Sequence, residues 1–521
     1  MHCPDLFYWR PVSRVSDAPA IDADLVVYGA TSAGVSAAVQ AARMGLRVAL
    51  AAFGRHVGGL TAGGLGETDT GRSEAIGGIA REFYRRIGAL GGDRGVIRFT
   101  PSAATAVFHD LLREHGVTVR YEQHLEQVVR DGARIVELRM TDGSRWRGGV
   151  YLDATYEGDL LAKADVSCRV GREDNTEYDE TVNGVYLSNN HTFPVAVDPW
   201  RTPGDPASGL LWGIDPAPLG PIGAGDQRVQ AYNFRMCLTD DPARRMPIFR
   251  PADYDPARYE LLRRLIAGGI FDCIALNSPL PDNKTDVNNE GGFSSDYIGA
   301  SDGWPEGTFE QREAIFQDHV SYTAGLWWFL QNDPDLPDAV RDEAAPWGLP
   351  RDEYADSGHW TPWLYIREAR RMVGRLVHTE HDCIGGRTVE DSIGMASYGI
   401  DSHNCRRLVA GGRVLNEGNV QVKVRFPWRI SYRAITPRRE QCANLLVPVC
   451  ASATHVAYSS LRMEPVFMIL GQSAATAAAL AIRHGCDVQD VPFPELRQRL
   501  LADGQVLEAA RRLWIPRYKG R

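Results

Sequence analysis

The sequence predicts an α/β fold: a three-layer domain around a parallel central sheet, with a second, α+β domain inserted into it. The first observation is the continuous apolar run at residues 25–28, which is typical of a strand buried on both faces. The second is an Ala/Val-rich segment of helical spacing at residues 35–44, followed by another apolar strand at residues 47–52. The third is a change of texture after residue 165, where prolines and glycines become dense at residues 194–225.

Glycines mark the turn between the first strand and the helix. Gly29 lets the chain turn tightly out of the strand, and Gly34 lets the helix pack close to the sheet. The N-terminus of that helix offers free N–H groups and a positive dipole end to a pyrophosphate. The unit is therefore Rossmann-like and predicts a dinucleotide site; the alternative is an ordinary βαβ crossover that binds no ligand.

Two positions depart from the usual dinucleotide pattern. Thr31 replaces the middle glycine, so the backbone approaches a phosphate less freely. Ala52 occupies the end of the second strand, where an acidic side chain normally binds the ribose hydroxyls. We therefore expect the adenosine end of a dinucleotide to lack its usual anchor.

A second glycine-rich loop, residues 58–64, directly follows the second strand. With this loop and residues 75–84, the chain resembles FAD-dependent oxidoreductases of the glutathione-reductase type, and distantly the fumarate reductase flavoproteins. The resemblance implies a Rossmann-like FAD-binding domain in which this loop runs past the ribityl chain and the isoalloxazine ring. His56 lies near the loop, but no attachment motif accompanies it, so we expect FAD to bind non-covalently.

The next elements are predicted from local patterns. They are a helix at residues 101–115, a strand at 117–121, a hairpin of strands at 127–129 and 134–141, and a strand at 146–152. The Asp131-Gly132 pair suits the hairpin turn.

Two further motifs resemble the family. Residues 152–159 resemble its D-A-T/S-x-E-G-D signature, where the chain returns to the cofactor; the alternative is a strand-to-helix turn capped by Asp159. Met463, Glu464 and Pro465 open an Ala-rich helix that extends to about residue 484. The resemblance implies that this helix points its N-terminus at the flavin's pyrimidine ring, where its dipole stabilises the negative charge of the reduced flavin.

The residues that the resemblance places at the cofactor are Gly29, Ala30, Thr31, Ala33, Gly34, Gly58, Gly59, Leu60, Thr61, Gly63, Gly64, Ala154, Thr155, Asp159, Met463, Glu464 and Pro465. No metal site is predicted.

The predicted domain order follows from these motifs. Residues 22–165 form the first part of the FAD-binding domain, 166–430 the substrate domain, 431–485 the second part of the FAD-binding domain, and 486–521 a helical tail. Residues 1–20 read as an irregular arm, and residues 450–462 as a polar loop.

Four side chains are the candidates for the reacting face. Residues 363–377 predict a basic helix on which Arg367, Arg371 and Arg375 share a face. Arg367 and Arg462 are predicted to hold an oxygen-bearing or anionic group. His403, in the sequence Y-G-I-D-S-H, and His455 are predicted to move a proton, the alternative being that each histidine is structural.

Composition limits the partners. The formal net charge of -9 argues against a nucleic-acid partner, and no apolar run is long enough to span a bilayer. Residues 1–20 contain no apolar segment of the secretory kind. The nine cysteines form no C-x-x-C pair, which indicates free thiols, no iron–sulfur cluster and a cytoplasmic location.

We therefore predict an FAD-dependent oxidoreductase that moves a hydride between the flavin and a small polar substrate of the alcohol, amine or hydroxy acid type. One alternative is an ene-reductase of the fumarate-reductase type. The other is a non-redox binding protein that has lost productive FAD binding, which Thr31 and Ala52 motivate. The electron acceptor and the oligomeric state stay open.

Overall fold

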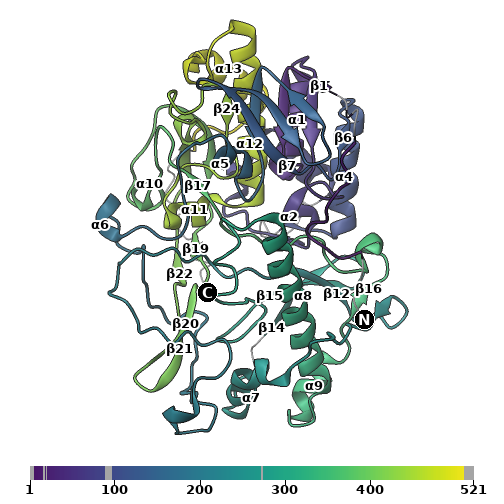
Figure 1. The fold of residues 1–521 in the computed structure, drawn as a ribbon, viewed down its shortest axis with the longest axis vertical. Coiled ribbons are helices and arrows are strands. Elements are labelled where there is room, and N and C mark those ends of the chain that lie inside the picture. Colours follow the sequence, from purple (N-terminus) through teal and green to yellow (C-terminus); the bar gives the residue numbers. More distant parts are fainter. Residues whose placement is uncertain (1–4, 16–17, 19, 89–96, 272–273, 510–521) are drawn as a thin grey trace, which may run out of the picture.

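A computed structural model describes residues 5–15, 18, 20–88, 97–271 and 274–509 of the chain. Its centre is a five-stranded sheet in the order β24-β10-β2-β3-β6, in which every neighbouring pair is parallel. These strands are β2 (Leu25–Tyr28), β3 (Val48–Ala51), β6 (Val119–Arg120), β10 (Val150–Asp153) and β24 (Leu445–Leu446). The sheet lies in the upper half of Figure 1.

Helices cover one face of this sheet and a smaller sheet covers the other. On the first face lie α1 (Ser32–Arg43) and α12 (Glu464–His484), which pack so closely that a Cβ on Gly471 would come within 2.1 Å of the Ala33 carbonyl oxygen. The second face carries β7 (Leu125–Asp131), β8 (Arg134–Met140), β9 (Arg145–Arg147) and β1 (Ala20–Asp22). The predicted three-layer α/β arrangement is confirmed.

Alternation along β2 explains why the strand is continuously apolar. Leu25 and Val27 join the core on the helix side, whereas Val26 and Tyr28 join the core beneath the smaller sheet. Both faces of β2 are therefore buried, as the apolar run predicts.

The larger part of the inserted region occupies the lower half of Figure 1, whereas its β17 (Arg371–Met372) and α10 (Glu380–Cys383) lie in the upper half. Its antiparallel sheet consists of β12 (Met236–Thr239), β15 (Lys284–Asn289) and β14 (Ile274–Leu280). Its helices α7 (Glu260–Ala267), α8 (Phe309–Asn332) and α9 (Asp338–Ala344) lie near that sheet. This is the predicted α+β composition; the exact domain boundaries stay predictions.

The remaining helices are α2 (Gly59–Ala62), α3 (Gly78–Arg86), α4 (Pro101–Glu114), α5 (Asp159–Lys163), α6 (Asn175–Tyr178), α10 (Glu380–Cys383), α11 (His455–Leu461) and α13 (Phe493–Ala502). The remaining strands are β4 (Glu67–Thr68), β5 (Ile97–Arg98), β11 (Cys168–Arg169), β13 (Arg245–Met246), β16 (Leu349–Pro350), β17 (Arg371–Met372), β18 (Ser392–Ala396), β19 (Ile400–Ser402), β20 (Arg406–Ala410), β21 (Arg413–Glu417), β22 (Val420–Val422) and β23 (Trp428–Ser431).

Three local predictions are wrong. The single strand expected at residues 146–152 is two strands, β9 and β10, in different sheets, because the chain crosses between the layers at Gly148 and Gly149. The polar loop expected at residues 450–462 contains α11, whose N-cap Thr454 accepts a hydrogen bond from the Ala457 N–H. A hydroxyl at this position satisfies a helix N-terminus, which the composition of the segment conceals.

The basic helix expected at residues 363–377 is absent; the segment is irregular except for β17. Arg367 and Arg371 are buried, whereas Arg375 is exposed, so the three do not share a helix face. Arg367 donates to the carbonyl of Ala231, and Arg371 to that of Gly171. These long-range hydrogen bonds hold the segment extended against its local helical pattern.

Among the described residues, α12 is the one helix long and apolar enough to cross a membrane, and 94% of its apolar window is buried inside the fold. It is the core helix that packs on α1.

Candidate functional site

At the junction of β2 and α1, Gly29 and Gly34 bring two backbone segments into direct contact. Gly29 has a φ of +105°, and a Cβ on Gly34 would lie 1.8 Å from the Gly29 carbonyl oxygen. The Thr31 hydroxyl accepts from the Gly34 N–H at 3.3 Å and donates to the Ala154 carbonyl at 2.7 Å. Thr31 therefore caps α1 and ties it to β10. The first N–H groups of α1 have no partner within the helix, so this end suits an anion.

The glycine-rich loop lies directly against this junction, since Thr31 forms an isolated parallel bridge with Gly58. Gly58 and Gly59 have φ values of +92° and +58°. A Cβ on Gly59 would lie 2.1 Å from the Tyr156 hydroxyl, which itself accepts from the Leu60 N–H at 2.9 Å. Farther along, Gly63 packs against Trp363 and Gly64 against the Arg235 carbonyl. The predicted loop glycines thus all stand at close contacts.

The first turn of α12 meets the same loop. Glu464 accepts from Thr61 Oγ1 at 2.5 Å and from the Tyr156 hydroxyl at 2.7 Å. Burial raises the pKa of Glu464. Met463 is the N-cap of α12, and Pro465 lies in its first turn.

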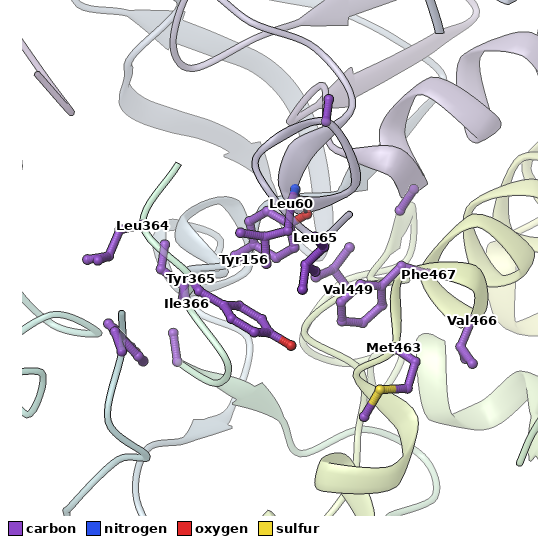
Figure 2. Packing of buried hydrophobic residues seen from close by; sticks show 14 of the residues in the cluster. Leu60, Leu65, Tyr156, Leu364, Tyr365, Ile366, Val449, Met463, Val466 and Phe467 are labelled. Carbon is purple, nitrogen blue, oxygen red and sulfur yellow. Dashed lines mark hydrogen bonds between the residues drawn. The ribbon is translucent and has the colours of Figure 1, made fainter. Parts of the chain in front are cut away.

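Two cavities lie near Tyr156, whose hydroxyl donates to Glu464 of one and whose ring packs against Trp363 of the other. The arm cavity is lined by Asp5, Phe7, Tyr8, residues 53–56, Glu157, residues 362–364 and Ile366. The central cavity is lined by Thr61, Leu65, Thr68, Asp69, Tyr365, Met463 and Glu464. Figure 2 shows the Tyr156 ring between Leu364 of the arm cavity and Met463 of the central cavity.

The residues after β10 begin at this junction, since a Cβ on Gly29 would lie 2.7 Å from the Ala154 carbonyl oxygen and 2.8 Å from the Thr155 nitrogen. The Thr155 hydroxyl donates to Asp153 Oδ1 at 2.7 Å, and burial raises the pKa of Asp153 to about 6. Asp159 forms ion pairs with Arg312 at 2.7 Å and with Arg370 at 2.9 Å. Although burial opposes it, Arg312 holds the pKa of Asp159 below its ordinary value. Asp159 thus joins α5 to α8, and its role at a cofactor stays a prediction.

A third, polar cavity contains His403. It is lined by Asn190, His191, Ser278, residues 288–290, residues 398–401, His403 and residues 421–423. His403 Nδ1 lies 2.6 Å from Asp296 Oδ2, and its Nε2 lies 3.8 Å from Asp401 Oδ2. Arg367 Nη2 lies 3.0 Å from the other Asp296 oxygen.

Electrostatics set the protonation of this pair. Burial and the Arg367 charge lower the pKa of His403 below its ordinary value. Arg367 and His403 hold the pKa of Asp296 low, although burial opposes them. At neutral pH the pair is therefore a carboxylate and a neutral imidazole, and the imidazole donates its Nδ1 proton to Asp296.

Arg462 connects the polar cavity with the central cavity. It donates through Nη1 to the Tyr365 hydroxyl at 3.0 Å and through Nη2 to the Asp401 carbonyl at 2.6 Å. Tyr365 lines the central cavity and Asp401 the polar one. Tyr398 of the polar cavity is also hydrogen-bonded to Asp69 of the central cavity. A polar network therefore crosses from one cavity to the other.

His455 lies apart from these cavities, in a buried network. Its Nδ1 lies 2.7 Å from Glu368 Oε2, and its Nε2 lies 2.9 Å from the Ser402 hydroxyl. Despite burial, the neighbouring His455 and Arg371 lower the pKa of Glu368 to about 2. The proton-transfer role of His455 stays a prediction, since both its ring nitrogens are already partnered by side chains.

Sequence reasoning did not name Asp296, Tyr365 or Glu157 as site residues. Asp296 lies in the loop between β15 and α8. Glu157 lies inside the D-A-T-Y-E-G-D signature, and Tyr365 two residues before Arg367. The sequence feature that could have identified Glu157 and Tyr365 is that each is polar and lies close to a predicted site residue. Only the fold shows that both line a cavity.

The family comparison decides the identity of the chain. The sequence model described as "FAD dependent oxidoreductase" matches residues 24–500. The chain belongs to this family. It is an FAD-dependent oxidoreductase, and FAD is its cofactor. No curated protein matches the chain.

Several solved flavoprotein structures resemble part of the chain. Thermovibrio ammonificans THI4 has a TM-score of 0.24 and 20% identity, over 29% of this chain and 66% of that one. T. acidophilum thioredoxin reductase has a TM-score of 0.18 and 23% identity, over 25% and 34%. The 3-ketosteroid-delta4-(5alpha)-dehydrogenase from Rhodococcus jostii RHA1 has a TM-score of 0.20 and 16% identity, over 30% and 51%. The chain thus spans less than two thirds of each.

The described residues fit FAD in this oxidoreductase. The bare junction at Gly29 and Gly34 presents the N-terminus of α1 to a pyrophosphate. The arm cavity adjoins the residues that follow β3, where the adenosine end of a dinucleotide lies in such folds. The central cavity adjoins the N-terminus of α12. Ala52 still departs from the usual dinucleotide-binding pattern, because its methyl group offers no hydrogen-bond acceptor to the ribose.

Proposed function

We propose that the enzyme oxidises a small polar alcohol, amine or hydroxy acid in the polar cavity, with His403 as the proton acceptor. The observation that carries this proposal is the His403–Asp296 pair, in which a neutral histidine lines a cavity of hydrogen-bonding side chains. A general base must be near its proton and unprotonated at the working pH, and His403 meets both requirements.

The pair also fixes which nitrogen acts. Asp296 accepts a hydrogen bond from the Nδ1–H, so Nε2 carries the free lone pair; this nitrogen lies 3.8 Å from the carboxylate of Asp401, which lines the cavity. Nε2 would then take the proton of a substrate O–H or N–H as the C=O or C=N bond forms. FAD supplies the hydride acceptor when bound. A neutral base favours oxidation of C–OH or C–N over the ene-reductase reaction, which needs a proton donor.

The two arginines have different roles in this proposal. Arg367 lies behind Asp296 and holds the carboxylate charged and oriented, so it is a positioning residue. Arg462 stands between the central and polar cavities and would hold a substrate oxygen.

The proposed setting is a cytoplasmic enzyme with a small-molecule substrate and a separate electron acceptor, without nucleic acid or membrane as partners. The net charge of -9 supports the absence of a nucleic-acid partner. The cysteines in the described part of the chain are all free thiols, which supports a reducing compartment.

The test is flavin bleaching without air. We expect the yellow protein to bleach with a small alcohol, amine or hydroxy acid, and His403→Ala to bleach about a hundredfold more slowly with unchanged flavin content. His484→Ala, which removes a histidine paired with Glu495 at the surface, is the control and should bleach normally. Bleaching of His403→Ala at the normal rate would contradict the role of His403. Reoxidation of the reduced enzyme by an unsaturated acid, with no bleaching by any alcohol or amine, would favour the ene-reductase.

A further inference from the structure

The ribose end of the cofactor site needs a hydrogen-bond acceptor that β3 does not provide. Ala52 is 1% exposed and carries only a methyl group. The residues that follow it, 53–56, line the arm cavity. None of these residues carries a carboxylate. Arg55 donates to the Asp5 carbonyl, and His56 pairs with Asp356 at 2.9 Å.

Glu157 provides a carboxylate in the same cavity from the neighbouring turn after β10. Its side chain is buried, which raises the pKa of Glu157 to about 7, and its Oε1 accepts from the Tyr8 hydroxyl at 3.1 Å. Within the described ranges, Tyr8 is the one side-chain hydrogen-bond donor to this carboxylate, so acceptor capacity remains. The other acid of the cavity, Asp5, is exposed at its rim.

The N-terminal arm holds Glu157 and the end of β3 together. The Tyr8 ring stacks on Phe53 with centroids 4.6 Å apart, while its hydroxyl reaches Glu157. The arm is itself anchored on α8, because Glu313 accepts the N–H groups of Tyr8 and Trp9 at 2.7 and 2.9 Å. Tyr8 therefore holds the carboxylate in the same cavity as the residues that follow Ala52.

We propose that Glu157 accepts hydrogen bonds from the hydroxyl groups of the adenosine ribose of FAD, in place of the carboxylate missing at Ala52. A diol needs a charged or strongly accepting oxygen pair, and a carboxylate is the side chain that provides both oxygens. The assignment concerns how FAD is held and is independent of the substrate, so it stands or fails separately from the role of His403.

The first experiment compares FAD with FMN, which lacks the adenosine half. The full-length protein is stripped of flavin, and each flavin is titrated while its fluorescence is followed. At about pH 8.5, above the pKa of Glu157, we expect Glu157→Gln to weaken FAD binding by about ten- to a hundredfold, the range for one hydrogen bond to a charged group, and to leave FMN binding unchanged. Glu137→Gln is the control, since it makes the same change at a buried glutamate outside the cavity, paired with Arg139 and Arg147.

Ala52→Glu provides a rescue. Adding it to Glu157→Gln places a carboxylate at the usual ribose position and should restore FAD affinity. Unchanged FAD affinity in Glu157→Gln, or an equal loss for FAD and FMN, overturns the proposal.

The second experiment needs no variant, so a folding defect of Glu157→Gln does not affect it. ADP and 2′-deoxyADP compete with FAD for the flavin-free wild-type protein. We expect ADP to compete at least about tenfold better, because the ribose hydroxyl supplies the bond to Glu157. Equal competition by the two nucleotides overturns the proposal.

Discussion

The glycine-rich junction around α1 makes its contacts through backbone atoms, whereas the charged region, here Arg312 of α8 and Arg367 with their carboxylate partners, makes its contacts through ion pairs. At the junction, contacts are made by backbone: a Cβ on Gly34 or Gly64 would come within 1.9 Å of a carbonyl oxygen. In the charged region, Arg312 and Arg367 are each 1% exposed and each paired with a buried carboxylate. The junction therefore tolerates no added volume, and the charged region tolerates no lost partner.

The difference follows from what each region does in the fold. The junction must bring α1, β10 and a phosphate-bearing cofactor together, so any side chain there takes the place of a partner. The charged region must hold an inserted domain against the central sheet through polar groups, and buried charges stay in place only when they are compensated.

The largest expected effect tests the volume limit at Gly59. Gly59→Val should abolish flavin retention, because the added atoms meet Tyr156 and the backbone of Thr31. Gly116→Val is the control: Gly116 has a similar φ of +65° but no atom within 4 Å of its Cβ position. It should keep its flavin and lose about 1–2 kcal/mol of stability from backbone strain. Full yellow colour in Gly59→Val would contradict the steric argument.

The next effect tests charge compensation at Arg312. Arg312→Met leaves the buried Asp159 without its bidentate partner and should lower the free energy of unfolding by about 3–5 kcal/mol. Arg497→Met removes the exposed pair with Glu508 and should change it by about 0–1 kcal/mol. Urea unfolding monitored by fluorescence measures both. Equal losses in the two variants would show that burial of the pair is irrelevant.

The third effect concerns the pH dependence of turnover. His403 must be neutral to accept a proton, and burial lowers its pKa below 6.5. We expect kcat/KM to be constant through neutral pH and to fall about tenfold per pH unit below the pKa of His403. Asp296→Asn removes the carboxylate that raises this pKa, so the fall should begin at a lower pH and from a lower plateau. An inflection well above pH 6.5 would exclude His403 as the base.

The smallest expected effect is on stability, at Thr31, where the junction makes its contacts through a side chain. Thr31→Ala removes the N-cap of α1 and the hydrogen bond to the Ala154 carbonyl, at a cost of about 1 kcal/mol. Thr31→Ser keeps the hydroxyl and should stay near the wild type. Thermal unfolding of the flavin-free protein measures this difference; a stabilised Thr31→Ala would mean that the cap contributes nothing.

The sequence by itself determined the elements whose causes are local. The apolar run of β2 predicts a strand, the glycines around α1 predict a turn, and the proline-led start and Ala-rich second half of α12 predict a helix. The structure contains all three.

Tertiary structure alone decided which polar groups meet. The pairs Tyr8–Glu157, Asp159–Arg312 and Asp296–His403 join segments that are far apart in the chain. Neither partner of such a pair carries a local sign of the other. The arginines of residues 367–375 show the same limit, since their helical spacing is overridden by carbonyls and carboxylates from distant segments. Local patterns record backbone preference, whereas the placement of a buried charge depends on a partner that only the completed fold supplies.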